Sequence, residues 1–112
     1  MIKKKFITPW GYSHYVYFCS QNGKEIKKFG SKESSSKNGE FNDPAGLTVN
    51  EKYLYVCDWG NDRVQVLDKE NGKFICEWKG GQRKIKYPMS ILLYENLFYL
   101  RWLWNSGIYK RR

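Results

Sequence analysis

Short apolar runs alternate with turn-forming residues along the middle of the chain. The runs are rich in β-branched and aromatic residues, and Tyr53–Cys57 alternates in the two-residue period of a strand. Asn71-Gly72 is a strong hairpin signal, because both residue types tolerate positive φ. Four strands are therefore predicted, at Gly46–Val49, Tyr53–Cys57, Arg63–Leu67 and Lys73–Trp78.

The same pattern recurs on both sides of this region. Pro44–Gln65 aligns without a gap with Pro88–Tyr109, and Phe6–Lys24 aligns in the same way with Tyr55–Lys73. A period of ~40–50 residues is typical of propeller blades, and four antiparallel strands make one blade. The sequence therefore predicts an all-β fold, an incomplete β-propeller of about two and a half four-stranded antiparallel blades.

One domain is expected, with a partial blade over residues 6–30, a full blade over residues 39–79 and a partial blade over residues 85–109. Such a segment cannot close a ring, so its ends would present unpaired edges and uncovered apolar faces. Three outcomes stay open. The chain associates with copies of itself to complete a propeller, it is a shortened and unstable derivative of a longer gene, or it persists as an open array.

The middle repeat, Gly39–Phe74 (GEFNDPAGLTVNEKYLYVCDWGNDRVQVLDKENGKF), resembles the NHL repeat. The family's pattern runs G-x-F-x-x-P-x-G-[IL]-x-V, a turn, and then [IL]-Y-V-x-D-x-G-N-x-R-[IV]-Q-V. The resemblance implies a closed propeller, typically of six blades, that serves as an interaction platform. Some members pair with ubiquitin-ligase modules, some bind RNA, and a related branch is enzymatic.

The outer repeats resemble the family less. The first has Pro9 and His14 at the positions of the signature Asp and Arg, and His14 is expected to be a surface turn residue. The last keeps Asn105 but has Trp102 for the Asp and Gly107 for the Arg.

The signature Asp58–Val66 (DWGNDRVQV) is interpreted as structural, with a ligand contact as the alternative. Asp58 is expected to accept backbone N–H groups of the following turn, and Arg63 to pair with Asp58 or with a loop carbonyl. Gly60 and Asn61 are expected to permit the turn dihedrals. Packing is expected for four large aromatic residues, Trp10, Trp59, Trp78 and Tyr55.

The chain has a formal net charge of +9, from 20 basic and 11 acidic residues. The excess gathers on Lys79–Lys86 (KGGQRKIK) and at the ends, Lys3–Lys5 and Lys110–Arg112. Such a loop can contact phosphates while aromatic rings stack on bases. The candidate contact residues for a partner or for nucleic acid are Lys79, Arg83, Lys84, Lys86, Tyr87 and Trp59.

No catalytic, cofactor or metal site is expected. The chain has no GxSxG motif, no P-loop and no defensible Ser/His/Asp set. Its single histidine and three cysteines lack zinc-ligand spacing, so Cys19, Cys57 and Cys76 are expected to be buried, reduced thiols.

A cytoplasmic protein is expected, because no segment reaches the ~20 apolar residues that span a bilayer and the N-terminal stretch is too short for a signal peptide. The favoured function is a non-enzymatic module that presents NHL-type blades to a protein partner. The alternatives are an RNA-binding surface at residues 79–86 and a truncated remnant of a longer propeller without its own activity.

Overall fold

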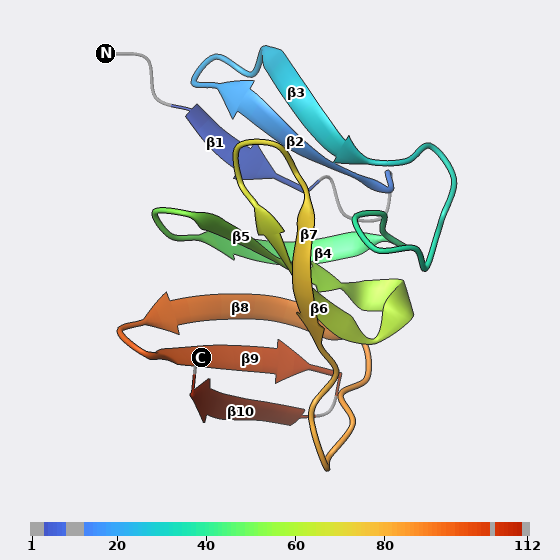
Figure 1. The fold of residues 1–112 in the computed structure, drawn as a ribbon, viewed down its shortest axis with the longest axis vertical. Coiled ribbons are helices and arrows are strands. Elements are labelled where there is room, and N and C mark those ends of the chain that lie inside the picture. The colour runs from blue at the N-terminus through green and yellow to red at the C-terminus, as the bar shows by residue number, and fades with distance from the viewer. Residues whose placement is uncertain (1–3, 9–12, 104, 111–112) are drawn as a thin grey trace.

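The computed structural model describes residues 4–8, 13–103 and 105–110, and its regular elements are β-strands apart from one short 3-10 turn. Ten strands form three antiparallel sheets that follow one another down the long axis of the molecule (Figure 1). The all-β class expected from the sequence is therefore confirmed. The described strands do not close into a ring.

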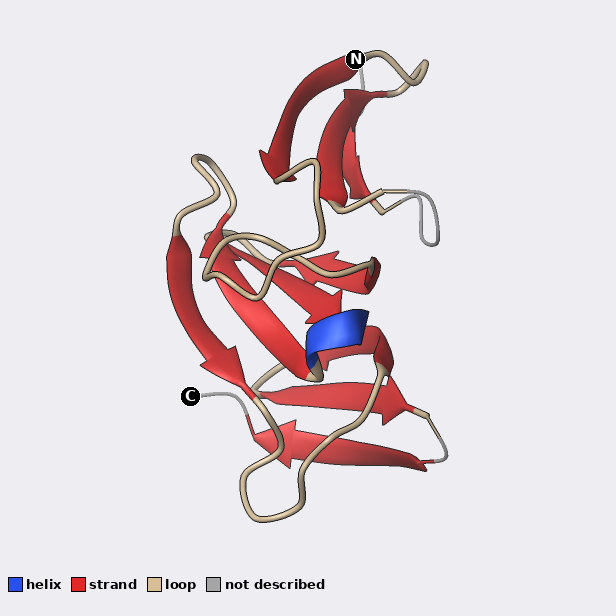
Figure 2. Ribbon diagram, turned by 90° about the vertical axis from the view of Figure 1, so that its right-hand side faces the viewer, coloured by secondary structure: helices blue, strands red, loops and turns tan. Residues whose placement is uncertain are grey.

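Each sheet is built from strands that are consecutive in the sequence. The first sheet contains β1 (Lys4–Ile7), β2 (Tyr15–Ser20) and β3 (Glu25–Gly30). The middle sheet contains β4 (Pro44–Val49), β5 (Tyr53–Asp58), β6 (Arg63–Asp68) and β7 (Phe74–Trp78). The last sheet contains β8 (Pro88–Tyr94), β9 (Leu97–Trp102) and β10 (Asn105–Lys110). The turn η1 (Trp59–Asn61) joins β5 to β6 and is the blue element in Figure 2.

The middle sheet confirms the four strands expected there, with bounds that differ by no more than two residues. Its hairpins form where turn residues allow them. Asn50 accepts the backbone N–H groups of Lys52 and Tyr53 through Oδ1 at 2.9 and 2.8 Å. Gly72 adopts a positive φ of 74° in the β6–β7 turn, a conformation that costs glycine little.

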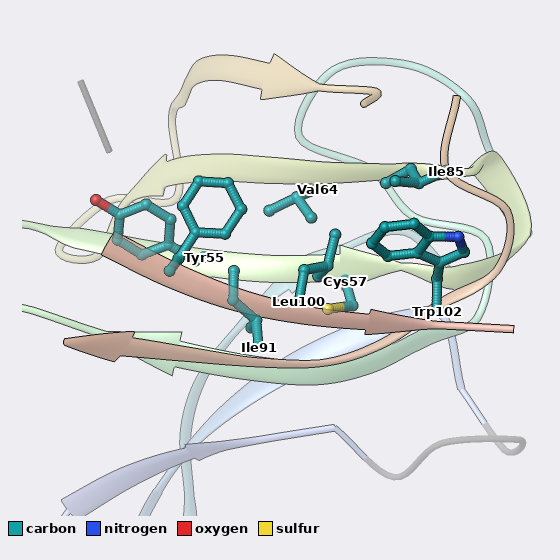
Figure 3. Close-up of a cluster of buried hydrophobic side chains, with 8 residues drawn as sticks. Tyr55, Cys57, Val64, Ile85, Ile91, Leu100 and Trp102 are labelled. Atoms are coloured by element: carbon teal, nitrogen blue, oxygen red, sulfur yellow. The ribbon is translucent and has the colours of Figure 1, made fainter. Parts of the chain in front are cut away.

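Two apolar layers separate the three sheets. Between the first and middle sheets lie Val16, Phe41, Leu54, Val56 and Leu67, all fully buried. Between the middle and last sheets lie Tyr55, Cys57, Val64, Ile85, Ile91, Phe98, Leu100 and Trp102 (Figure 3). Each large apolar side chain contributes about 1.5–3 kcal/mol when fully buried, so these layers hold the sheets together.

The last sheet repeats the middle sheet in its first two strands. Leu47 lies opposite Val56 in β4–β5, and Ile91 lies opposite Leu100 in β8–β9. Both pairs of strands also have a register shift just after their first residue, a proline. The expected alignment of residues 44–58 with residues 88–102 therefore holds for the backbone pairing as well as for the sequence.

The third strand of the last sheet departs from the gap-free alignment. Tyr99 lies opposite Ile108, whereas the matching Tyr55 lies opposite Val66 and not Val64. The physical reason is the turn, because Trp102 pairs directly with Asn105 while Asp58 pairs with Arg63 across η1. The expected match of Val64 with Ile108 is therefore wrong by two positions.

The first sheet departs from its expected alignment by one position. Phe6 pairs with Phe18, although the alignment would place it opposite Tyr17. The shift turns Val16 toward the middle sheet, where it is fully buried. Since side chains alternate in a strand, a shift of one residue exchanges the two faces.

Among the described residues no helix is long and apolar enough to cross a membrane.

Candidate interaction surfaces

The signature residues of the middle sheet form a buried polar network. Asp58 and Gln65 are fully buried and Arg63 is nearly so. Arg63 Nε donates to Asp58 Oδ2 at 2.8 Å, and Gln65 Nε2 donates to the same oxygen at 3.0 Å. The guanidinium also donates to the carbonyls of Lys37 and Glu40, at 3.0 and 3.2 Å. The expected pairing of Arg63 with Asp58 or a loop carbonyl is therefore confirmed, and the network fastens the loop of residues 31–43 to the sheet.

Asp58 performs this role differently from the expectation. It makes no side-chain cap to the turn η1 that follows it. Its Oδ1 instead accepts the backbone N–H of Asn42 at 2.8 Å, across to the preceding loop. The expectation of a local Asx turn is wrong, because the backbone N–H bound by the carboxylate is that of Asn42, and within η1 the carboxylate instead accepts the Asn61 side-chain Nδ2 at 3.0 Å.

The turn glycine and asparagine also act through contacts and not through dihedrals. The left-handed residue of this turn is Asp62, with φ 53°. Gly60 is needed for space, since a Cβ there would lie 2.4 Å from the Asn42 side chain and 2.8 Å from its carbonyl oxygen. Asn61 Nδ2 donates to the Ser35 carbonyl at 2.7 Å. The expectation that Gly60 and Asn61 supply turn dihedrals is therefore wrong.

The basic loop of residues 79–86 is anchored from within. Ile85 is 1% exposed and belongs to the layer between the middle and last sheets, and its N–H donates to the Lys79 carbonyl at 3.1 Å. Gly80, with φ 103°, allows a close turn that a Cβ would block at 2.2 Å from the Arg83 carbonyl oxygen. Arg83 and Lys84 are consequently held on the outside, exposed to solvent.

The candidate aromatic residues lie beside this loop, as expected. The Trp59 and Tyr87 rings have centroids 4.5 Å apart with planes at 33°. Asp62 holds the pair in place, because its Oδ1 accepts the Tyr87 N–H at 2.9 Å and its Oδ2 lies 3.3 Å from Lys86 Nζ. The structure thus brings Trp59, Tyr87 and Lys86 together. Lys79 instead lies 3.9 Å from Glu77.

The first repeat's candidate residues have simpler environments. His14 is half-buried and its Nδ1 accepts the Asp43 N–H at 3.0 Å, so it ties the first sheet to the middle loop. Lys5 and Lys110 are exposed. Pro9, Trp10, Lys3, Arg111 and Arg112 lie outside the described residues.

A further exposed surface lies on the last sheet. The sequence predicted uncovered apolar faces but did not indicate which residues form them. The outward side of the last sheet presents Leu92, Tyr99 and Ile108 in one cross-strand row, 67%, 43% and 65% exposed. Tyr94 and Leu97 form the next row and are 73% and 41% exposed. The alignment of Pro44–Gln65 with Pro88–Tyr109 held the signal, since Tyr99 matches the buried Tyr55.

The cysteines differ from one another in exposure. Cys19 and Cys57 are buried, but Cys76 on β7 is exposed, so the expectation of three buried thiols is wrong for Cys76. Burial raises the pKa of Cys57 to about 12. A hydrogen bond with the Gly46 backbone lowers this pKa and the nearby Asp58 charge raises it, and both effects are smaller than that of burial. Burial also raises the pKa of Cys76.

Among the described residues no group of three or more His, Cys, Asp or Glu side chains is placed to hold a metal ion. No protein-family model matches the chain, and no curated protein matches it significantly.

Proposed function

We propose that this chain is a non-enzymatic protein-interaction module, an incomplete NHL-type propeller that docks a partner on the outward face of its last sheet. The observation that carries the proposal is the row of Leu92, Tyr99 and Ile108, which projects apolar side chains into solvent. Contiguous exposed apolar patches of this kind mark interaction sites in soluble proteins.

Three further observations support this proposal. The sheets are antiparallel and consecutive, and the first strands of the middle and last sheets, β4 and β8, are in contact. The outward face repeats the middle-sheet face that packs on its neighbour, with Tyr99 in place of Tyr55. A face whose counterpart is an internal packing surface is suited to packing on another protein.

A cytoplasmic location forms part of the same proposal.

The test is affinity capture with a matched pair of variants. In the face variant Leu92, Tyr99 and Ile108 are all changed to Ser, whereas the control variant changes Ile7 and Ile26 of the first sheet, 37% and 47% exposed. We expect partners recovered with the wild-type chain to persist with the control and to be lost with the face variant. Equal recovery with all three chains would contradict the proposal.

A second function is favoured by the ring stack of Trp59 and Tyr87. The two rings lie at the end of the loop that carries the exposed Arg83, Lys84 and Lys86, and aromatic rings together with basic groups are the elements of single-strand recognition. We infer RNA binding at this surface as the competing proposal. Lys86 and Lys79 contribute less to it, because each already lies near a carboxylate.

Fluorescence anisotropy with a single-stranded RNA tests this alternative. Binding should weaken steeply with salt, with a slope of about −0.7 per phosphate contact. Changing Arg83, Lys84 and Lys86 to Ala should abolish it, while a control triple of Lys24, Lys32 and Lys52 to Ala should not. Unchanged affinity in the first triple would exclude this surface.

A further inference from the structure

The last sheet has an open edge where the middle sheet has a fourth strand. In the middle sheet β6 pairs with β5 on one side and with β7 on the other. In the described residues β10, which takes the place of β6, pairs with β9 alone. An unpaired strand edge carries a row of backbone donors and acceptors that can template another strand.

A cavity of about 630 Å³ adjoins this edge. Its lining comes from both sheets and includes Ile75, Cys76 and Trp78 of β7 together with Tyr109 and Lys110 of β10. Within this lining the rings of Trp78 and Tyr109 are in contact, with centroids 4.4 Å apart. The side chains of a strand point alternately to its two sides. One side of a strand added to β10 would thus face this cavity, and the other would extend the row of exposed apolar residues beside Ile108.

The charges near the edge indicate the chemistry of the added strand. Lys110 ends β10. Burial raises the pKa of the neighbouring Tyr109 phenol, and the nearby Arg83 charge partly offsets that rise, so Arg83 also lies near this edge. Within the described part of the chain neither cation forms an ion pair. Glu77 is the one acidic residue that lines the cavity, and it already lies 3.3 Å from Arg63 and 3.9 Å from Lys79. The surroundings of the edge therefore favour a negatively charged partner.

We propose that the partner contributes an extended acidic segment that adds to β10 as a fourth, antiparallel strand. Its alternate apolar side chains enter the cavity beside Trp78 and Tyr109, and its acidic groups face Lys110 and Arg83. Backbone hydrogen bonds supply affinity in this mode of recognition, and side-chain pockets supply specificity. The inference rests on the proposed docking function and names the part of the partner that binds.

The chain provides its own probe, because β7 occupies the corresponding place in the middle sheet. The first peptide copies residues 71–80 (NGKFICEWKG), with Ser in place of its cysteine. A second, acidic peptide also has Glu in place of both lysines. A third is the acidic peptide with Pro at the position of Ile75, which removes a backbone donor from the strand.

Titration of the full chain, followed by backbone amide NMR, gives the readout. The acidic peptide should bind more tightly than the first peptide and should shift the amides of Asn105–Lys110. The proline peptide should bind about tenfold more weakly. Lys110→Glu should weaken the acidic peptide about threefold, whereas Lys24→Glu on a distant hairpin should leave it unchanged. Alkylation of Cys76, which lines the cavity, should slow in the complex.

Absence of binding by every peptide, or shifts confined to residues 79–87, would overturn the inference. A free chain that sediments as a dimer with β10 already protected would overturn it too, since a second copy would then occupy the edge. If the peptides fail while capture still depends on Leu92, Tyr99 and Ile108, strand addition is wrong and the proposed function stands. If capture does not depend on these residues either, both are wrong.

Discussion

The middle and last sheets share a pattern and differ in what covers them. β4–β5 and β8–β9 have the same register, and the inward-facing Val56 and Leu100 are both fully buried. On the other face the matched tyrosines diverge, because Tyr55 is 7% exposed and Tyr99 is 43% exposed. The same strand pattern therefore forms an internal layer where another sheet packs on it and an exposed surface where no sheet does.

The largest contrast is expected at the polar network, which among the described residues is found in the middle sheet alone. Asp58→Ala would leave the buried Arg63 guanidinium without its carboxylate, and we expect a loss of about 3–5 kcal/mol in the free energy of unfolding. The last sheet has the half-buried Asn105 at the place of Arg63. Asn105→Ala should cost below about 1 kcal/mol. Urea unfolding of both variants measures this, and equal losses would remove the distinction between the sheets.

The next contrast separates the two matched tyrosines. Tyr55→Ala should lower the free energy of unfolding by about 3 kcal/mol, because the buried ring leaves a cavity. Tyr99→Ala should lower it by below about 1 kcal/mol, because its ring is largely in solvent. Thermal and urea unfolding give both values. A cost for Tyr99→Ala as large as that for Tyr55→Ala would mean that the outward face is already covered in solution.

Fold and site differ in how far the sequence predicts them. The middle sheet was predictable to within two residues, since alternation and turn residues are local signals. The shift at β10 was not, because it depends on the direct pairing of Trp102 with Asn105 across a turn two residues shorter than the one it matches. The contact between Asp58 and Asn42 was not predictable either, because it joins segments that only the sheet register brings together.

The exposed surfaces were also only partly predictable from the sequence. The basic residues of the loop at 79–86 are visible in the sequence, and Tyr87 and Trp59 were named as candidate stacking residues, but their contact with each other was not predicted. The carboxylate of Asp62, which faces Lys86 and restrains the stack, could not be assigned from spacing. The outward row of the last sheet was not identified from the sequence, because the alignment matches Tyr99 to Tyr55 but does not show that no neighbouring sheet covers it.

A smaller effect concerns Cys57, whose matched residue in the last sheet is the exposed Arg101. Burial raises the pKa of the Cys57 thiol from 9.0 to about 12, so the folded state keeps the neutral thiol where the unfolded state ionises. This contribution to stability is complete below pH 9 and is lost as pH rises from 9 toward 12, by about 1.4 kcal/mol per pH unit.

Urea unfolding above pH 9 tests this against Cys57→Ala, which retains every other titrating group. We expect the stability of the wild-type chain to fall more steeply with pH than that of the variant. Parallel curves for the two chains would show that this thiol is not buried in solution.

Hydrogen exchange of the backbone amides in the free chain compares β6 with β10 most directly. β6 is paired on both sides, whereas β10 pairs with β9 alone, so alternate β10 amides point away from β9 toward the open edge. We expect these alternate amides to exchange on the order of 100-fold faster than those of β6. Uniform protection along Asn105–Lys110, equal to that of Arg63–Asp68, would contradict the claim that the last sheet is open to a partner.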